Sequence, residues 1–202
     1  MFGGRFDPPH RMHLAIARQA LAQLGLAELH WVVSGLAPHK PSVASPLDRL
    51  AMVRCALAQE NDPRMLANDF EVKASREGRL SYTIDTLRAL TAVRPQHRLV
   101  LIIGSDQARH FDTWKDWKEI LGMVDLAVVD RPGFVTNDFV EKCQSRGTPV
   151  TRLKMAADPI SATEIRASFL GSKRVPDGVI ESVALYARKR RLYETATQPG
   201  TL

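Results

Sequence analysis

The sequence has little cysteine, no long uncharged apolar segment, and no repeat or low-complexity tract. Its two cysteines, Cys55 and Cys143, lie far apart in helix-like contexts, which argues against a disulfide framework and against a cysteine metal site. No run of about 18 uncharged apolar residues exists that could span a membrane. The early Arg5 and Asp7 do not fit a signal peptide. We therefore expect a cytoplasmic protein that binds no membrane and keeps both cysteines reduced in its core.

A modest excess of basic residues is the next feature. The chain has 202 residues, 45% of them hydrophobic, with 28 Lys and Arg against 22 Asp and Glu and a net charge of +6. This length can bury one substantial core, so we expect a single domain over residues 1–194 and a disordered tail over 195–202. The charge suits a phosphate-bearing ligand and equally suits weak nucleic-acid binding.

Apolar runs and helical periodicity alternate along the chain. Short apolar runs predict strands over residues 29–33, 65–72, 99–103, 125–129 and 150–153. Periodic segments predict helices over residues 13–24, 46–59, 81–93, 114–121, 137–145, 161–170 and 176–186. Such alternation predicts an α/β protein with a Rossmann-like, doubly wound parallel sheet covered by helices on both faces. Ligands of these sheets bind beyond the carboxyl ends of the strands, which points to residues 3–13, 34–41 and 104–106.

The segment GGRFDPPHRMH at residues 3–13 combines small residues with two histidines. Gly3 and Gly4 permit a sharp turn and a close approach of backbone N–H groups to a ligand. His10 and His13, three residues apart at a helix start, project to the same side. Imidazole donors at a helix N-terminus suit a phosphate. The histidines could instead be ordinary helix-start residues or two ligands of a metal, but no further ligand cluster is evident, so we predict no metal site.

A second helix start lies at ISATEIR, residues 160–166. Ser161 and Glu164 match a capping box, which is by itself a sufficient structural reason for both residues. Arg166 lies one turn into this helix, where its guanidinium could reach a phosphate at the helix N-terminus. Two helix starts that both suit a phosphate indicate a phosphate-binding protein much more specifically than either one alone.

GGRFDPPHRMH resembles the GG(T/S)FDPxHxGH signature of nucleotidyltransferases, and ISATEIR resembles their ISSTxIR motif. The resemblance implies catalytic roles for His10, His13 and Arg166 and an ATP site that includes Gly3, Gly4, Arg5, Phe6, Ser161 and Thr163. Arg5 replaces the usual Thr or Ser. Met12 replaces a glycine and is expected to narrow the ATP pocket unless its flexible side chain bends away. The few residues before Gly3 imply a truncated or mis-assigned start, or a central strand that lacks part of its length.

Three further segments carry the resemblance to the acceptor side. Pro38-His39-Lys40 resembles the family's PHK segment, which implies that Lys40 lies near phosphate. SYTIDTL at residues 81–87 resembles an element of nicotinate mononucleotide adenylyltransferases, which implies that Thr83, beside Tyr82, recognises the pyridine carboxylate; Ser81 is predicted to cap this helix. The run from Gly104 through Trp117 resembles the family's G(A/S)D…F..W..W pattern, which implies that Asp106 contacts nucleotide and that Trp114 stacks on the pyridine ring. Lys115 stands where the family often has Tyr.

The resemblance as a whole implies transfer of the adenylyl group of ATP to nicotinate mononucleotide, with Mg²⁺ accompanying ATP and pyrophosphate released. Two alternatives stay open. One is another adenylyl- or cytidylyltransferase, for example one that uses pantetheine phosphate. The other is a non-catalytic nucleotide- or RNA-binding protein, favoured by the basic cluster at residues 188–191, although cations at a helix C-terminus also complement its dipole. We expect no nucleic-acid partner, and a homo-oligomer stays possible.

Overall fold

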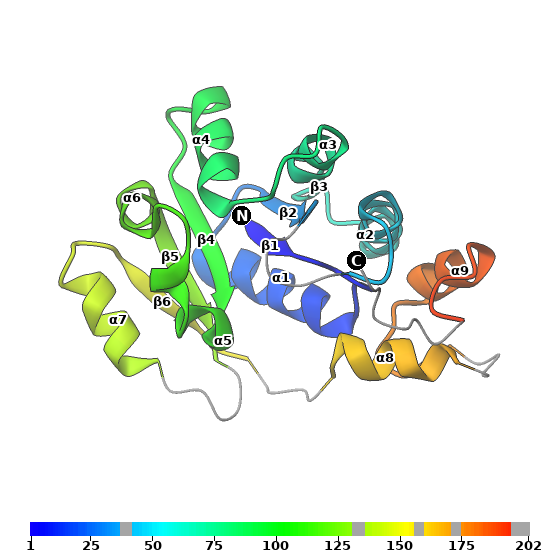
Figure 1. Cartoon of the computed structure of the whole chain (residues 1–202). Coiled ribbons are helices and arrows are strands. Elements are labelled where there is room, and N and C mark those ends of the chain that lie inside the picture. The colour runs from blue at the N-terminus through cyan, green and yellow to red at the C-terminus, as the bar shows by residue number, and fades with distance from the viewer. Residues whose placement is uncertain (37–41, 131–135, 156–159, 171–174, 195–202) are drawn as a thin grey trace.

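A six-stranded, wholly parallel sheet forms the centre of the molecule (Figure 1). The computed structural model describes residues 1–36, 42–130, 136–155, 160–170 and 175–194. The strands are β1 (Phe2–Gly4), β2 (Leu29–Val33), β3 (Met65–Asn68), β4 (Leu99–Gly104), β5 (Val124–Val129) and β6 (Val150–Leu153), in the order β3-β2-β1-β4-β5-β6. The strand order reverses direction at β1 and β4, so this is a doubly wound sheet with its switch point between them.

Helices cover both faces of the sheet (Figure 1). They are α1 (Arg11–Leu24), α2 (Pro46–Glu60), α3 (Phe70–Arg76), α4 (Thr83–Val93), α5 (Ser105–Ala108), the 3-10 helix η1 (Phe111–Thr113), α6 (Trp117–Met123), α7 (Asn137–Gln144), α8 (Ala162–Phe169) and α9 (Glu181–Lys189). One hydrophobic cluster joins the sheet to α1, α2, α8 and α9, and the other joins it to α4, α6 and α7. The predicted fold class is confirmed.

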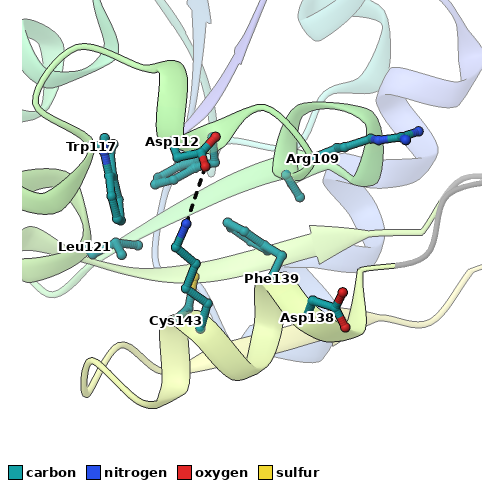
Figure 2. A pocket seen from close by; sticks show the side chains of 10 residues that line it. Arg109, Asp112, Trp117, Leu121, Asp138, Phe139 and Cys143 are labelled. Carbon is teal, nitrogen blue, oxygen red and sulfur yellow. Dashed lines mark hydrogen bonds and ion pairs between the residues drawn. The ribbon is translucent and has the colours of Figure 1, made fainter.

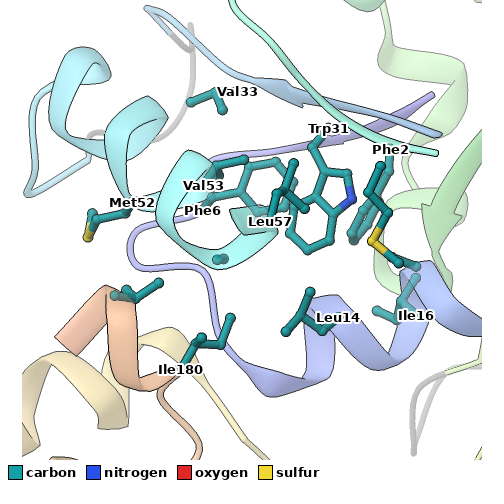
Figure 3. Packing of buried hydrophobic residues seen from close by; sticks show 14 of the residues in the cluster. Phe2, Phe6, Leu14, Ile16, Trp31, Val33, Met52, Val53, Leu57 and Ile180 are labelled. Atoms are coloured by element: carbon teal, nitrogen blue, oxygen red, sulfur yellow. The ribbon is translucent and has the colours of Figure 1, made fainter. Parts of the chain in front are cut away.

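An aromatic group fixes the first cluster beside β1. The Trp31 ring is fully buried between Phe2 and Phe6, with Leu14 and Leu57 around it (Figure 3). It stacks on Phe6 with ring centroids 5.1 Å apart and meets Phe2 edge-on at 5.2 Å. Burying aromatic side chains provides much of the free energy that stabilises such a core. This packing anchors the segment that leads from β1 to α1.

Three predicted elements need correction at their ends. The strand predicted over 65–72 stops at Asn68, because Val72 packs into the core from helix α3. The helix predicted from residue 114 begins at Trp117, since Asp116 before it has a left-handed φ of 52°. The helix predicted from residue 176 begins at Glu181, because 176–180 form a turn in which Gly178 has a φ of 81°.

The carboxyl ends of the strands meet at one edge of the sheet. Gly4 pairs with Val33, and Gly104 pairs with Val129, so the segments that follow these strands begin at similar heights. β1 is the shortest of the described strands, with three residues. None of the described helices is long and apolar enough to span a membrane. The division into a domain over 1–194 and a tail stays a prediction, and 195–202 lie outside the described residues.

Candidate nucleotide-binding site

The loop between β1 and α1 turns at a different residue from the one expected. Gly3 and Gly4 lie in strand β1 and have no left-handed φ, so the predicted sharp turn at the glycines is wrong. The left-handed residue is Phe6, with a φ of 51°. Gly4 is needed for space, because a Cβ there would come within 3.0 Å of the Phe6 ring. Gly3 is exposed, which leaves its backbone open to a ligand.

His10 and His13 lie side by side at the start of α1, as their spacing predicts. Their ring centroids are 3.8 Å apart, and His10 is the N-cap residue of the helix. The backbone N–H of His10 donates to Nδ1 of His13 at 3.1 Å. Because Nδ1 accepts, the neutral His13 ring carries its proton on Nε2. Nε2–H is therefore a donor of fixed tautomer in the first turn of α1, at the positive end of the helix dipole.

Met12, between the two histidines, is half-buried and packs against the hydrophobic cluster of α1 and α2. The side chain that replaces the expected glycine thus makes a core contact. Whether it also narrows the nucleotide pocket stays a prediction.

Ser161 caps the start of α8, as the capping-box pattern predicts, but the Glu164 carboxylate accepts the Ser161 hydroxyl in place of the Ser161 backbone N–H. The Ser161 hydroxyl accepts the Glu164 N–H at 3.2 Å and lies 2.9 Å from the Glu164 carboxylate, to which it donates. That hydroxyl already uses its proton within the cap, so the geometry favours the structural role of Ser161. Exposed Thr163 accepts from Nη2 of Arg166 at 3.2 Å, which holds the guanidinium over the first turn of the helix.

Arg166 connects the two predicted phosphate-binding segments. Its Nη1 donates to the backbone oxygen of Asp7 at 2.8 Å, a contact between residues 159 positions apart. Half-buried Arg5 is influenced by the charges of both Asp7 and Arg166. Burial lowers the pKa of Arg5, the Asp7 carboxylate raises it, and the Arg166 guanidinium lowers it further. The charges of Arg5 and Arg166 are thus close enough to interact, and a polyphosphate bound beside them would offset that repulsion.

Asp7 and Arg49 are structural residues of this site that the sequence reading missed. The Asp7 carboxylate is buried and accepts the backbone N–H groups of Val43 at 2.7 Å and Ala44 at 3.1 Å. Arg49 is 1% exposed and donates to the carbonyl oxygens of Arg5 at 2.7 Å, of Gly35 at 3.1 Å and of Ala44 at 3.2 Å. Burial lowers the pKa of Arg49, while the Asp7 charge raises it. Together these two side chains fasten the loop after β1 to the loop after β2.

The predicted acceptor residues lie at the start of α4 and after η1. Tyr82 is the N-cap of α4 and Thr83 its first residue, both half-buried. Ser81 is not the cap, because its hydroxyl accepts the Gly35 N–H at 2.9 Å and so ties α4 to the end of β2. Half-buried Trp114 has extended backbone and lies against Phe111, with ring centroids 5.0 Å apart.

Lys115 brings the two acceptor segments together. Its Nζ lies 4.6 Å from the Tyr82 ring centroid and 3.5 Å from the Asp85 carboxylate. A hollow of about 310 Å³ is lined by Tyr82, Lys115 and residues of α3 and α4. The cation that replaces the expected Tyr therefore covers the ring of Tyr82, next to Trp114.

The remaining predicted residues are Asp106 and Lys40. Asp106 lies in α5 directly after β4, at the carboxyl edge of the sheet, and its Oδ2 accepts from Gln107 at 3.2 Å. Lys40 lies outside the described residues. Within the described ranges, no three His, Cys, Asp or Glu side chains form a group that could hold a metal ion.

A larger cavity, of about 510 Å³, lies between η1, α6 and α7 (Figure 2). The ion pair between Lys142 and Asp112, 3.4 Å long, crosses it, and Cys143 lies in its wall. None of the predicted site residues lines this cavity. It is therefore distinct from the place where the histidines and Arg166 gather.

Beyond the strands of this doubly wound parallel sheet lie two adjacent histidines and an arginine that reaches the same loop, an arrangement that agrees with the nucleotidyltransferase class. The family model described as cytidylyltransferase-like matches residues 1–168. The chain is 41% identical to a probable nicotinate-nucleotide adenylyltransferase of Albidiferax ferrireducens over 97% of this chain and 98% of that protein. It is 35% identical to another of Bordetella avium, with the same coverage. The chain belongs to the cytidylyltransferase-like family, in its nicotinate-nucleotide adenylyltransferase branch.

The fold also matches solved structures. The nicotinic acid mononucleotide adenylyltransferase of Plasmodium falciparum, complexed with NaAD, superposes with a TM-score of 0.77 at 16% identity, over 96% of this chain and 95% of that one. A structure described as a putative nicotinate-nucleotide adenylyltransferase of Vibrio parahaemolyticus matches with a TM-score of 0.66 at 15% identity. These matches support the fold. The family model ends before α9, which therefore lies outside that match.

Proposed function

We propose that the protein transfers the adenylyl group of ATP to nicotinate mononucleotide, which gives nicotinate adenine dinucleotide and pyrophosphate for NAD biosynthesis. The observation that carries this proposal is the contact of Arg166 with the Asp7 backbone, because it joins two helix starts that both favour anions. Relatives named for this activity, 41% and 35% identical over nearly their whole length, support it.

The mechanism that this site supports is in-line displacement at phosphorus. A phosphate oxygen of the mononucleotide attacks the α-phosphorus of ATP, and the bond to the pyrophosphate leaving group breaks. The nucleophile is already anionic at neutral pH, so no general base and no covalent intermediate are required. His10, the Nε2–H of His13, Arg166 and Lys40 bind and neutralise the phosphates as charge moves onto the leaving group.

Magnesium enters this proposal as part of the substrate. No three metal-ligating side chains gather among the described residues, and Mg²⁺ in nucleotide sites is commonly held by substrate phosphates and water. We propose that the ion arrives with ATP and supplies additional positive charge to the phosphates. We also propose that the protein is cytoplasmic, because Cys55 and Cys143 are both free thiols.

The reaction can be tested by measuring pyrophosphate release from Mg-ATP with three acceptors: nicotinate mononucleotide, nicotinamide mononucleotide and phosphopantetheine. We expect nicotinate mononucleotide to give the highest kcat/KM, and ATP without acceptor to give no release. Release with phosphopantetheine alone would assign a different acceptor. Binding of ATP without release for any acceptor would indicate the non-catalytic alternative.

A substitution at Trp114 gives a second test of the acceptor site. Replacing Trp114 by alanine is expected to raise the KM for nicotinate mononucleotide about twofold to tenfold, since aromatic stacking contributes roughly 0.5–1.5 kcal/mol. The KM for ATP should stay unchanged. Trp117→Ala is the matched control, because Trp117 lines the cavity beside α7 and contacts Lys142, with Nζ 4.9 Å from its ring centroid. An unchanged acceptor KM in the Trp114 variant would remove that ring from the acceptor site.

A further inference from the structure

The segment after α9 returns to the nucleotide site. Backbone bonds from Arg191 to Arg188 and from Leu192 to Ala187 close the helix, and Tyr193 then adopts a left-handed φ of 66°. This turn directs Tyr193 into the core, where it is 5% exposed and packs on Phe169 of α8, with ring centroids 5.5 Å apart.

The Tyr193 hydroxyl donates to Oδ1 of Asp7 at 2.7 Å, across 186 positions of the sequence. Burial and the neighbouring Asp7 carboxylate raise the pKa of Tyr193 far above its ordinary value, so the hydroxyl remains a donor at any working pH. A hydrogen bond to a carboxylate in a buried site is stronger than one between neutral groups. Tyr193 therefore restrains the Asp7 side chain.

Asp7 passes this restraint to both sides of the nucleotide site. Its backbone oxygen accepts from Nη1 of Arg166 at 2.8 Å, and its carboxylate accepts the N–H groups of Val43 and Ala44. Moving Asp7 would therefore displace the Arg166 guanidinium and the backbone at residues 43 and 44 together. Small displacements of groups that hold a reacting phosphate reduce rates strongly.

We propose that Tyr193 is a positioning residue for adenylyl transfer, which acts through Asp7 to hold Arg166 at the ATP phosphates. This inference rests on the proposed function for its kinetic effect. It assigns the segment directly after α9 a role in ATP binding, although Tyr193 itself is placed away from the substrate.

The test compares Tyr193→Phe with Tyr186→Phe. Both variants lose one hydroxyl that donates to a carboxylate, because Tyr186 donates to Oδ1 of Asp48 at 3.0 Å. Asp48 lies in α2, and its bond to Tyr186 involves none of the predicted site residues. Tyr186→Phe therefore reports the effect on stability of losing such a hydroxyl, without an effect on the site. For each protein we would measure the Kd for ATP by calorimetry, without acceptor. Pyrophosphate release would then give kcat and the KM for each substrate.

In Tyr193→Phe we expect kcat/KM for ATP to fall about threefold to tenfold and the Kd for ATP to rise at least about threefold, with the acceptor KM unchanged. Tyr186→Phe should keep wild-type values. A purely structural loss would lower the fraction of active enzyme. It would therefore reduce the apparent kcat but leave the KM for each substrate unchanged. Wild-type ATP affinity in Tyr193→Phe, or equal effects in both variants, would overturn the proposal.

The two proposals fail in different ways. If the wild type binds ATP but releases no pyrophosphate with any acceptor, the proposed function is wrong, and the Kd comparison still decides the role of Tyr193. If the wild type binds no ATP, both proposals are wrong.

Discussion

Replacing His13 by alanine is expected to lower kcat at least about tenfold, which corresponds to about 1.4 kcal/mol of lost transition-state stabilisation. The reason is the fixed tautomer: Nδ1 accepts the His10 N–H, so Nε2 carries the proton that the proposed mechanism donates to the phosphates. Charge develops on the pyrophosphate leaving group during the reaction, and a positioned donor binds that charge better than water does. The measurement is pyrophosphate release at saturating ATP and acceptor.

Alanine at this position also removes a hydrogen bond to the start of α1, so two further variants separate chemistry from stability. Asparagine can replace Nδ1 as the acceptor for His10 N–H but has no donor at the place of Nε2. Glutamine has its amide near the place of Nε2. We expect His13→Asn to fold with near wild-type stability and to lose as much activity as His13→Ala, and His13→Gln to keep more. Wild-type turnover in His13→Asn would remove His13 from the mechanism.

The fold could be predicted because its strands are short apolar runs. β2 and β4 stand out as LHWVV and LVLII, and both are buried within a sheet that has helices on both faces. α3 could not be separated from the preceding strand, since Val72 is apolar and close in sequence to Met65. Hydrophobicity alone does not distinguish a core residue on a strand from one on a short helix.

The site could be predicted only where it is local in sequence. His10 and His13 are three residues apart, and a helix start brings their rings together whatever the rest of the fold does. Ser161 is a second local case: its spacing to Glu164 predicts a cap, and the structure shows that cap. The contacts of Asp7 with Tyr193 and Arg166 join residues 186 and 159 positions apart, and no spacing rule reaches that far.

Arg49 illustrates a further reason why part of the site could not be foreseen. An arginine in the first turn of a helix is ordinarily exposed, yet Arg49 is buried and its guanidinium binds three backbone carbonyl groups. Those carbonyls belong to two loops whose conformations follow from the fold as a whole. A residue whose partners are backbone atoms leaves no recognisable partner residue in the sequence.

Replacing Arg166 by alanine is expected to lower kcat/KM for ATP by about 100-fold, the order found when a positioned donor to transition-state charge is removed. Arg166 joins the start of α8 to the loop after β1 by Nη2 to Thr163 and by Nη1 to the Asp7 backbone, and its charge acts together with that of Arg5. Its loss therefore removes a cation and loosens the junction of the two segments that are predicted to bind phosphate. The acceptor KM should change little, because Tyr82 and Trp114 lie on other elements.

Two comparisons define what the loss of Arg166 means. Arg166→Lys keeps the positive charge, but one ammonium cannot hold both Thr163 and Asp7 in the planar geometry of a guanidinium, so we expect activity between that of the alanine variant and the wild type. Arg18→Ala removes an arginine of α1 that is paired with Glu60 at 2.6 Å on the surface, and it should leave kcat/KM unchanged. If Arg166→Lys equals the wild type, charge alone suffices and the junction has no catalytic role. If Arg166→Ala equals Arg18→Ala, ATP does not bind at this junction at all.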